Sequence, residues 1–243
     1  MDTTKANIIS QLQKDINSLQ GSKITSKNAL WDIGLGSIKN AFPNNEFPLG
    51  AIHEFIYTSA EDAAVTSGFV STLLASLMQH NRVSAWISPS GTIFPTALHS
   101  FGIAPDKTIF IDVKREKEIL WVMEEALKCN SLTAVVAALP ELSFTTSRRL
   151  QLAVEKSRVT GFILRCNPRN LNTTACVTRW KITSLPSELL KAMPGVGFPR
   201  WNVELLKVRN GYPGQWQVAF SAGRFRHFYR QTVIYQDQQK KTG

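Results

Sequence analysis

Short apolar runs alternate with helical patterns through the middle of this sequence, and this alternation restricts the fold more than any other feature. Each run has the length of a β-strand, and the stretches between runs carry apolar residues at helical spacing. The expected strands are residues 51–57, 83–88, 108–112, 132–138 and 159–165, and the expected helices are residues 61–80, 92–101, 114–129 and 143–157. Strands that alternate with helices indicate βαβ units, so we expect an α/β fold with a mostly parallel sheet and helices on both faces.

The helical patterns end after residue 165, and the remaining sequence predicts a different arrangement. The dipeptides Asn210-Gly211 and Pro213-Gly214 are typical of a turn between two strands. We expect antiparallel strands here, at residues 175–182, 201–208 and 216–220.

The composition indicates one folded domain with short arms. The chain has 243 residues, of which 43% are hydrophobic and 19% charged, and this excludes disorder throughout its length. Apolar residues at helical spacing predict an amphipathic helix near the N-terminus, followed by a polar linker. The expected parts are this helix and linker at residues 1–29, a core domain at residues 30–220 and a basic tail at residues 221–243.

Positive charge is concentrated near the C-terminus. The formal net charge is +10, and residues 195–243 carry eight basic residues against two acidic ones. A basic segment of this kind indicates contact with nucleic acid or with an acidic protein surface. A solvated tail that aids solubility explains the charge equally well.

The cysteines give no sign of a metal or disulfide site. The three cysteines form no CxxC pair and are isolated from the four histidines, so we expect no metal and no other cofactor. Free thiols fit a reducing cytoplasm. The N-terminus lacks the pattern of a secretory signal, and no apolar run is long enough to cross a bilayer. We therefore expect a cytoplasmic protein with no membrane contact.

The first strand-to-helix turn, at residues 57–64, lacks the groups that bind phosphate in nucleotide-binding α/β folds. Those turns use glycines for close backbone approach, helix N-terminal amides and a lysine. This turn contains neither glycine nor lysine, and it carries Glu61 and Asp62, whose charges would repel a triphosphate. We expect Ser59 or Asp62 to act as the N-cap of the following helix instead.

A second part of a nucleotide-hydrolysing site is also missing. The strand at residues 132–138 ends without an acidic residue that could hold magnesium, and Glu141, which follows a proline, is a weak substitute. We therefore expect no NTP hydrolysis, no catalytic residues and no enzymatic activity.

Several stretches resemble a known family. WDIGLG at residues 31–36 and FPLGAIHEF at residues 47–55 resemble the entry to the core of RecA-type recombinases. LWVMEEAL at residues 120–127 and RRLQLAVE at residues 148–155 are more specifically similar to the ImuA family of RecA-like accessory proteins. The resemblance spans residues 30–220 in the same order, and it implies a RecA-like three-layer core.

The resemblance also implies a function in DNA repair. ImuA proteins take part in the SOS response to DNA damage, where they support mutagenesis through error-prone translesion synthesis. Their implied partners are ImuB, a Y-family polymerase-like protein, and an error-prone replicative-type polymerase, with RecA and DNA as further candidates. Two alternatives stay open: a RecA-like DNA-dependent ATPase with an unorthodox nucleotide site, and a cell-division inhibitor related to SulA.

Lys207 and Arg209 are candidate contact residues. They lie in KVRNG, which resembles the K-x-R-x-G turn that replicative helicases and RadA-type ATPases present to a neighbour's nucleotide. By this analogy the pair would reach a partner's nucleotide or acidic surface. The favoured alternative is a hairpin turn with two solvated charges.

Arg224, Arg226 and Arg230 are further candidates, because aromatic residues lie between them. Arginine neutralises phosphate and aromatic rings stack on exposed bases, so this segment could contact nucleic acid. Contact with a polymerase-like partner, or an edge segment whose aromatic rings pack on the core, would explain the same pattern. The loop at residues 166–173 is too short for DNA binding in the manner of RecA.

The remaining chemistry-bearing residues have structural explanations. His53 lies in an expected strand and is interpreted as a core or edge histidine rather than a ligand. Trp31, Trp86, Trp121 and Trp180 lie in apolar or periodic contexts, and we expect all four in the core.

Overall fold

The computed structural model describes residues 11, 34–79, 82–89, 93–188, 197–221 and 224–228. The chain divides into two units, residues 1–31 and 32–243, and only the second is described below. Apart from residue 11, the predicted N-terminal helix and linker lie outside the described residues, as do residues 229–243 of the predicted tail. None of the helices in the described ranges has the length and apolar character needed to span a membrane.

Within the described residues, nine strands form a single sheet and helices lie against it. The strands are β1 (Ile52–Tyr57), β2 (Val83–Ser88), β3 (Thr108–Asp112), β4 (Leu132–Ala138), β5 (Thr160–Cys166), β6 (Thr178–Glu188), β7 (Phe198–Val208), β8 (Gly214–Ser221) and β9 (Arg224–Phe228). The helices are α2 (Ala60–Leu77), α3 (Pro95–Leu98), α4 (Glu116–Lys128) and α5 (Phe144–Ser157), with 3-10 turns η1 (Gly36–Ala41), η2 (Pro43–Asn45), η3 (His99–Phe101) and η4 (Pro105–Lys107).

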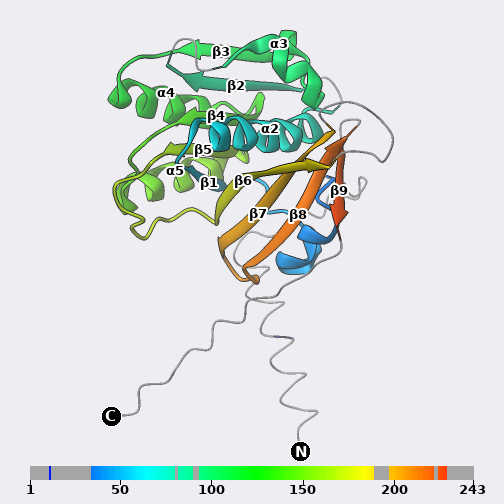
Figure 1. Cartoon of the computed structure of the whole chain (residues 1–243). Helices are drawn as coiled ribbons and strands as arrows, with labels where there is room; N and C mark the ends of the chain where they lie inside the picture. Colours follow the sequence, from blue (N-terminus) through cyan, green and yellow to red (C-terminus); the bar gives the residue numbers. More distant parts are fainter. Residues whose placement is uncertain are drawn as a thin grey trace, which may run out of the picture. The chain divides into compact units, whose positions relative to one another are not determined.

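The strand order is β3-β2-β4-β5-β1-β6-β7-β8-β9 (Figure 1). Neighbours from β3 to β6 run parallel, and neighbours from β6 to β9 run antiparallel. The five predicted parallel strands are confirmed. The strand expected at residues 175–182 is β6, which pairs antiparallel with β7 as predicted but parallel with β1, so it joins the two halves of the sheet.

Helices cover both faces of the parallel half. Apolar side chains of α4 and α5, such as Met123 and Leu150, form one buried cluster with Ile52 of β1 and Val135 of β4. On the other face, Phe69 of α2 packs against the aromatic rings of the sheet. This arrangement confirms the three-layer α/β core that the sequence predicts.

The sheet continues beyond the expected core boundary at residue 220. β9 lies in the stretch assigned to a basic tail, and it pairs with β8. The ring of Phe225 is buried and stacks on Phe69 of α2, with centroids 5.1 Å apart. A neighbouring glycine makes room for this aromatic layer, because a Cβ at Gly68 would lie only 2.8 Å from the ring of Phe101.

The prediction for the tryptophans is right for two of the three that are described. Trp86 and Trp180 are buried, whereas Trp121 is 64% exposed, so its placement in the core is wrong. The helix α4 contacts β2 and β4. Trp121 lies on the side of α4 near the end of β3, which is the edge strand of the described sheet. Helical spacing places Trp121 among apolar residues of α4, but it does not show whether a strand of the sheet covers the residue. Trp31 lies outside the described residues.

Candidate functional site

The turn between β1 and α2 is the position at which nucleotide-binding α/β folds hold phosphate. Here Ser59 is the N-cap of α2, and its Oγ accepts a hydrogen bond from the backbone N–H of Asp62 at 3.0 Å. The prediction of Ser59 as a cap is therefore confirmed. Glu61 and Asp62 lie in the first helical turn, and an oxygen of Asp62 also accepts a hydrogen bond from the N–H of Ser184 at 3.4 Å. The turn is thus capped by its own side chain and presents negative charge.

Tyr57 lies at the strand end beside this turn, next to Cys166. Tyr57 and Cys166 are register partners where β1 and β5 end, and the N–H of Asn167 donates to the carbonyl of Tyr57 at 2.7 Å. Burial raises the pKa of Tyr57 to about 12, and the neighbouring Cys166 adds to this shift. The phenol therefore stays protonated and uncharged at neutral pH.

Glu141, the weak substitute for a magnesium ligand, is hydrogen-bonded to a nearby loop. Its Oε1 accepts a hydrogen bond from the N–H of Arg169 at 3.1 Å, and its Oε2 lies 3.6 Å from Nη2 of Arg165. Among the described residues, no three His, Cys, Asp or Glu side chains gather closely enough to hold a metal ion.

A buried charged cluster lies on the α5 side of the sheet, and its residues come from β1, β5 and β6. Glu54 is fully buried and forms an ion pair with Arg165, which is also fully buried. The second oxygen of Glu54 accepts hydrogen bonds from Nε of Arg179 at 2.9 Å and from the hydroxyl of Thr174 at 3.0 Å. Burying charge is costly unless every partner is in place, and here one carboxylate has three partners. The sequence analysis missed this cluster, although Glu54 and Arg165 are charged residues inside apolar strands.

The charged cluster holds the loop at residues 167–175. Nη2 of Arg165 donates to the carbonyl of Asn170 at 3.5 Å, and Nη2 of Arg179 donates to the carbonyl of Asn172 at 2.7 Å. The hydroxyl of Ser147 in α5 accepts a hydrogen bond from the N–H of Ala175 at 2.9 Å. The loop between β5 and β6 is therefore tied at several points to the layers beneath it.

Lys207 and Arg209 also bind this loop. Nζ of Lys207 donates to the carbonyl of Thr174 at 2.6 Å, and Nη2 of Arg209 donates to the carbonyl of Ala175 at 2.9 Å. Partial burial lowers the pKa of Lys207, and the nearby cations Arg179 and Arg209 act in the same direction. Lys207 is thus a half-buried structural donor rather than a solvated charge, while Arg209 is exposed and bonded to its own chain.

The structure describes the three candidate arginines of the predicted tail to different extents. Arg226 is exposed on β9. Arg224 lies in the same strand, but its side chain is outside the described part, and Arg230 is outside it altogether. Phe225 packs on the core, as one of the interpretations of this segment predicts.

His53 is confirmed as a buried core residue. Its Nδ1 lies 2.8 Å from the hydroxyl of Thr178, and its Nε2 lies 2.8 Å from the carbonyl of Pro48. The hydroxyl of Thr178 also accepts a hydrogen bond from the indole of Trp180 at 2.7 Å, which leaves its own proton for Nδ1. Burial lowers the pKa of His53 to about 3, so the ring is neutral and donates from Nε2.

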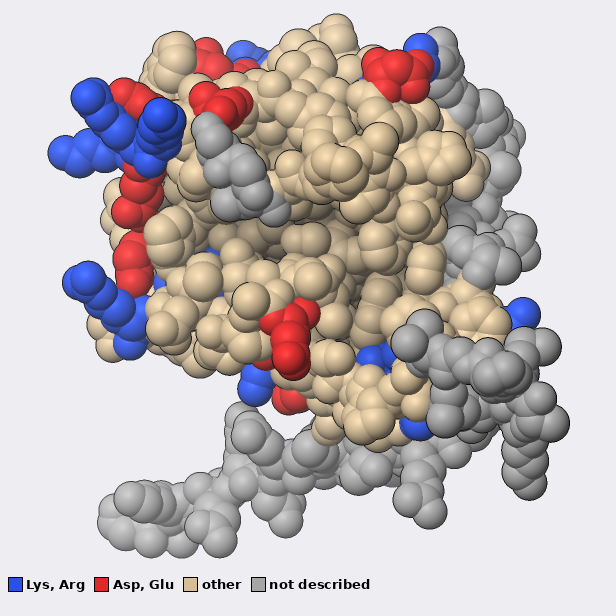
Figure 2. Space-filling view, turned by 45° about the horizontal axis from the view of Figure 1, so that its top comes forward, with Lys and Arg blue, Asp and Glu red and all other residues tan. Residues whose placement is uncertain are grey.

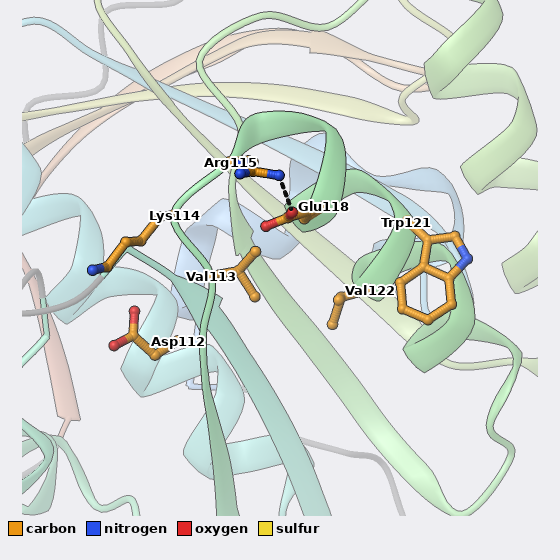
Figure 3. Close-up of a pocket in the computed structure, with 7 residues that line it drawn as sticks. All are labelled: Asp112, Val113, Lys114, Arg115, Glu118, Trp121 and Val122. Carbon is orange, nitrogen blue, oxygen red and sulfur yellow. Dashed lines mark hydrogen bonds and ion pairs between the residues drawn. The ribbon is translucent and has the colours of Figure 1, made fainter.

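A hollow lies apart from this site, between the end of β3 and the start of α4 (Figure 3). Its volume is about 600 Å³. Val113 and Val122 lie between the charged side chains on one side of the hollow and the ring of Trp121 on the other. The lining residues are Asp112, Val113, Lys114, Arg115, Glu118, Trp121 and Val122. The sequence analysis did not predict this hollow.

A solved structure supports the fold. The crystal structure of the RadB recombinase matches 81% of this chain and 98% of its own chain, with a TM-score of 0.57 and 14% identity. The predicted RecA-like core is therefore confirmed.

Sequence comparisons identify the family. The family model described as cell division inhibitor SulA matches residues 50–161. A SulA from Yersinia pestis (strain Pestoides F) is 27% identical over 130 residues, which cover 53% of this chain and 76% of the relative. Protein ImuA from Caulobacter vibrioides (strain NA1000 / CB15N) is 32% identical over 210 residues, which cover 81% of this chain and 86% of the relative. The chain therefore belongs to the ImuA family.

Proposed function

We propose that this chain is a non-catalytic accessory protein of the damage-induced mutasome, which supports error-prone translesion synthesis through protein–protein contacts. Its membership of the ImuA family supports an accessory role in mutagenesis. The expected partners are an ImuB-like Y-family polymerase-like protein and an error-prone replicative-type polymerase, with RecA as a further candidate.

One observation carries the non-catalytic part of the proposal. In the turn between β1 and α2, Ser59 accepts the N–H of Asp62, a group that a phosphate would need. Glu61 and Asp62 then place two carboxylates in the first helical turn, where a triphosphate would be repelled. The RecA-like core in this proposal serves as a body for docking.

The exposed face of β9 is the proposed contact region for an acidic partner or for DNA. Arg226 is exposed there, and Arg224 and Arg230 follow the same basic pattern in the sequence. Lys207 and Arg209 have a different task in this proposal, because both donate to carbonyls of the loop at residues 167–175 and so shape the surface near them.

Genetic complementation tests the accessory role. In a strain that lacks this gene, we expect the wild-type chain to restore ultraviolet-induced mutation to drug resistance, and the Arg224→Ala/Arg226→Ala variant to restore much less. Lys156→Ala, which removes an exposed charge from α5, is the matched control and should complement fully. No effect of the gene on induced mutation would contradict the proposal.

Co-purification tests the partners separately. The tagged chain should retain the Y-family polymerase-like protein from cells in which both are expressed. The Arg224→Ala/Arg226→Ala variant should retain less of it, and Lys156→Ala should retain the wild-type amount. Loss of the partner from the wild-type chain would count against the expected assembly.

A phosphate-release assay tests the absence of catalysis. The purified chain with ATP, Mg²⁺ and single-stranded DNA should release no more phosphate than the buffer does. A signal that Lys207→Ala abolishes would instead favour the alternative of an ATPase with an unorthodox site.

The likeness to SulA supports a second candidate, a cell-division inhibitor. It rests on residues 50–161 and on relatives that cover 53% of the chain, which is less than the ImuA match covers. Filamentous growth on overproduction in cells that lack the polymerase-like partner would favour this second function.

A further inference from the structure

The strand β3 forms one end of the sheet described here, and its apolar side chains are exposed on both faces. Ile109 is 51% exposed and Phe110 is 37% exposed. Successive side chains of a strand point to opposite faces, so the two residues lie on different sides of the sheet. An exposed apolar edge strand is a site at which another strand can pair.

The backbone N–H and C=O groups of successive β3 residues point alternately towards β2 and away from it. The N–H of Val113 donates to the carbonyl of Ser88 in β2 at 3.2 Å, so Val113 faces β2. Neighbouring residues of a strand direct their peptide groups to opposite edges. The peptide groups of Thr108, Phe110 and Asp112 therefore face away from β2.

These three outward-facing residues are symmetric about Phe110. In an antiparallel pair with a two-fold axis at Phe110, this residue lies opposite its own copy, and Thr108 lies opposite Asp112. The two copies of Phe110 can exchange both of their backbone hydrogen bonds. Moving the axis to Ile109 or Ile111 would leave part of the set without a strand residue opposite it.

The charges that flank β3 are complementary under the same symmetry. Asp106 precedes the strand by two residues and Lys114 follows it by two residues. The axis at Phe110 brings Asp106 of each copy to the same end of the strand pair as Lys114 of the other copy. Both side chains are exposed, and Asp106 otherwise has a long ion pair with Lys107 at 3.8 Å.

The surface around β3 offers apolar groups that a second copy could cover. Figure 2 brings the β3 side of the molecule forward and shows a broad area without charged side chains, bordered by acidic and basic groups. On the α4 side, Val113, Val122 and the exposed ring of Trp121 line the hollow at the end of the strand (Figure 3). The turn η4 of a second copy would lie next to this hollow, because η4 comes directly before Thr108, and Thr108 lies opposite Asp112, one of the lining residues.

We propose that a second copy of this chain binds through β3, so that the two sheets join as an antiparallel pair around a two-fold axis at Phe110. The backbone edge supplies the hydrogen bonds, Ile109 and Phe110 supply apolar contact on the two faces, and Asp106 and Lys114 fix the register. This inference stands independently of the proposed role in mutagenesis.

The first experiment measures the mass of the full chain by sedimentation equilibrium across a wide range of concentrations. We expect a transition from 27.1 kDa to twice that mass, with no larger species. Ile109→Lys places like charges across the two-fold axis and should weaken the dimer at least about tenfold. Leu206→Lys is the matched control, because it introduces the same charge at an apolar strand residue that is 41% exposed on β7.

The second experiment exchanges the two charges that set the register. Asp106→Lys and Lys114→Asp should each weaken the dimer about fivefold, because each replaces two attractive contacts by two repulsive ones. The double variant Asp106→Lys/Lys114→Asp restores opposite charges at both ends and should recover the wild-type dissociation constant. A role of these residues in folding alone would not give this recovery.

Three outcomes would overturn the proposal. The first is a monomer at every concentration. The second is a mass that grows without limit, which indicates head-to-tail association rather than a closed two-fold pair. The third is a dimer that Ile109→Lys and the single charge exchanges leave unchanged, since its interface would then lie elsewhere. Circular dichroism of each variant shows whether the fold is retained.

Discussion

Two regions around β1 differ in how they hold charge. In the buried cluster, Arg165 and Arg179 each form an ion pair with Glu54 inside the protein. In the first turn of α2, Glu61 and Asp62 lie at a surface helix end. Incomplete buried ion pairs are costly, whereas charge at a helix N-terminus contributes little. Buried charges in this RecA-like core therefore hold the loop at residues 167–175 in place. They do not act on the turn that holds phosphate in nucleotide-binding folds.

The largest expected effect comes from breaking the buried cluster. Glu54→Gln removes the carboxylate and leaves the guanidinium groups of Arg165 and Arg179 without a buried counter-charge. We expect the free energy of unfolding to fall by about 3 to 5 kcal/mol, measured by urea denaturation. Glu141→Gln is the control, since Glu141 also approaches Arg165 but is about half exposed, and it should cost less than about 1 kcal/mol.

The same variant tests whether the cluster holds the loop. Hydrogen exchange of residues 167–175 should become faster in Glu54→Gln, while exchange in the first turn of α2 should stay unchanged. Equal losses in the Glu54 and Glu141 variants, or no change in exchange of the loop, would mean that the buried cluster is not what fixes this region.

His53 extends the comparison to a buried group that is kept neutral. Its pKa falls from 6.5 to about 3 on folding because of burial. The unfolded chain therefore binds a proton below pH 6.5 that the folded chain excludes, and the related stability is lost as the pH falls from 6.5 towards 3. At pH 5 we expect a loss of about 2 kcal/mol relative to neutral pH.

The matched variant for this prediction is His53→Gln, whose amide can still donate to the carbonyl of Pro48. Its stability at neutral pH should be lower than that of the wild type, but its decrease between neutral pH and pH 5 should be smaller by about 2 kcal/mol. Identical pH dependence of unfolding in the two proteins would show that His53 is not the group responsible.

A smaller loss of stability is expected when the surface cap of α2 is removed. Ser59→Ala removes the cap of α2, and Ser143→Ala removes the equivalent cap of α5, where Oγ accepts the N–H of Thr146 at 3.0 Å. Each should cost about 1 kcal/mol in thermal or urea unfolding. Damage-induced mutagenesis should respond alike to both variants. A loss of function specific to Ser59→Ala would indicate that this turn binds a ligand.

The sequence predicted the parallel half of the sheet better than the antiparallel half, for a physical reason. Strands buried on both faces are continuous apolar runs, so the runs at residues 51–57 and 132–138 matched β1 and β4 closely. β9 alternates arginine with aromatic residues, and such a basic segment looks like a solvated tail in the sequence. Only its pairing with β8 shows that it is a strand. The exposure of Trp121 depends on which strand ends the sheet, and local spacing does not contain that information.

The candidate site was predictable only in part. The absence of phosphate-binding groups at residues 57–64 is a local property, and so is the cap formed by Ser59. The partner of Lys207 is the carbonyl of Thr174, 33 residues earlier in the chain, which no motif specifies. Charged residues inside apolar strands, Glu54 and Arg165, were a usable signal, because such residues need a buried partner from another strand.

The smallest expected effect addresses the turn itself. Glu61→Gln removes one charge from the first turn of α2, where a carboxylate interacts favourably with the helix dipole. We expect a loss of about 0.3 to 1 kcal/mol in urea unfolding at low salt, which becomes smaller as salt screens the interaction. If carboxylates alone kept phosphate away, Glu61→Gln/Asp62→Asn would gain affinity for ATP in isothermal calorimetry. We expect no such gain, because this turn still lacks the lysine and the glycines that a triphosphate needs.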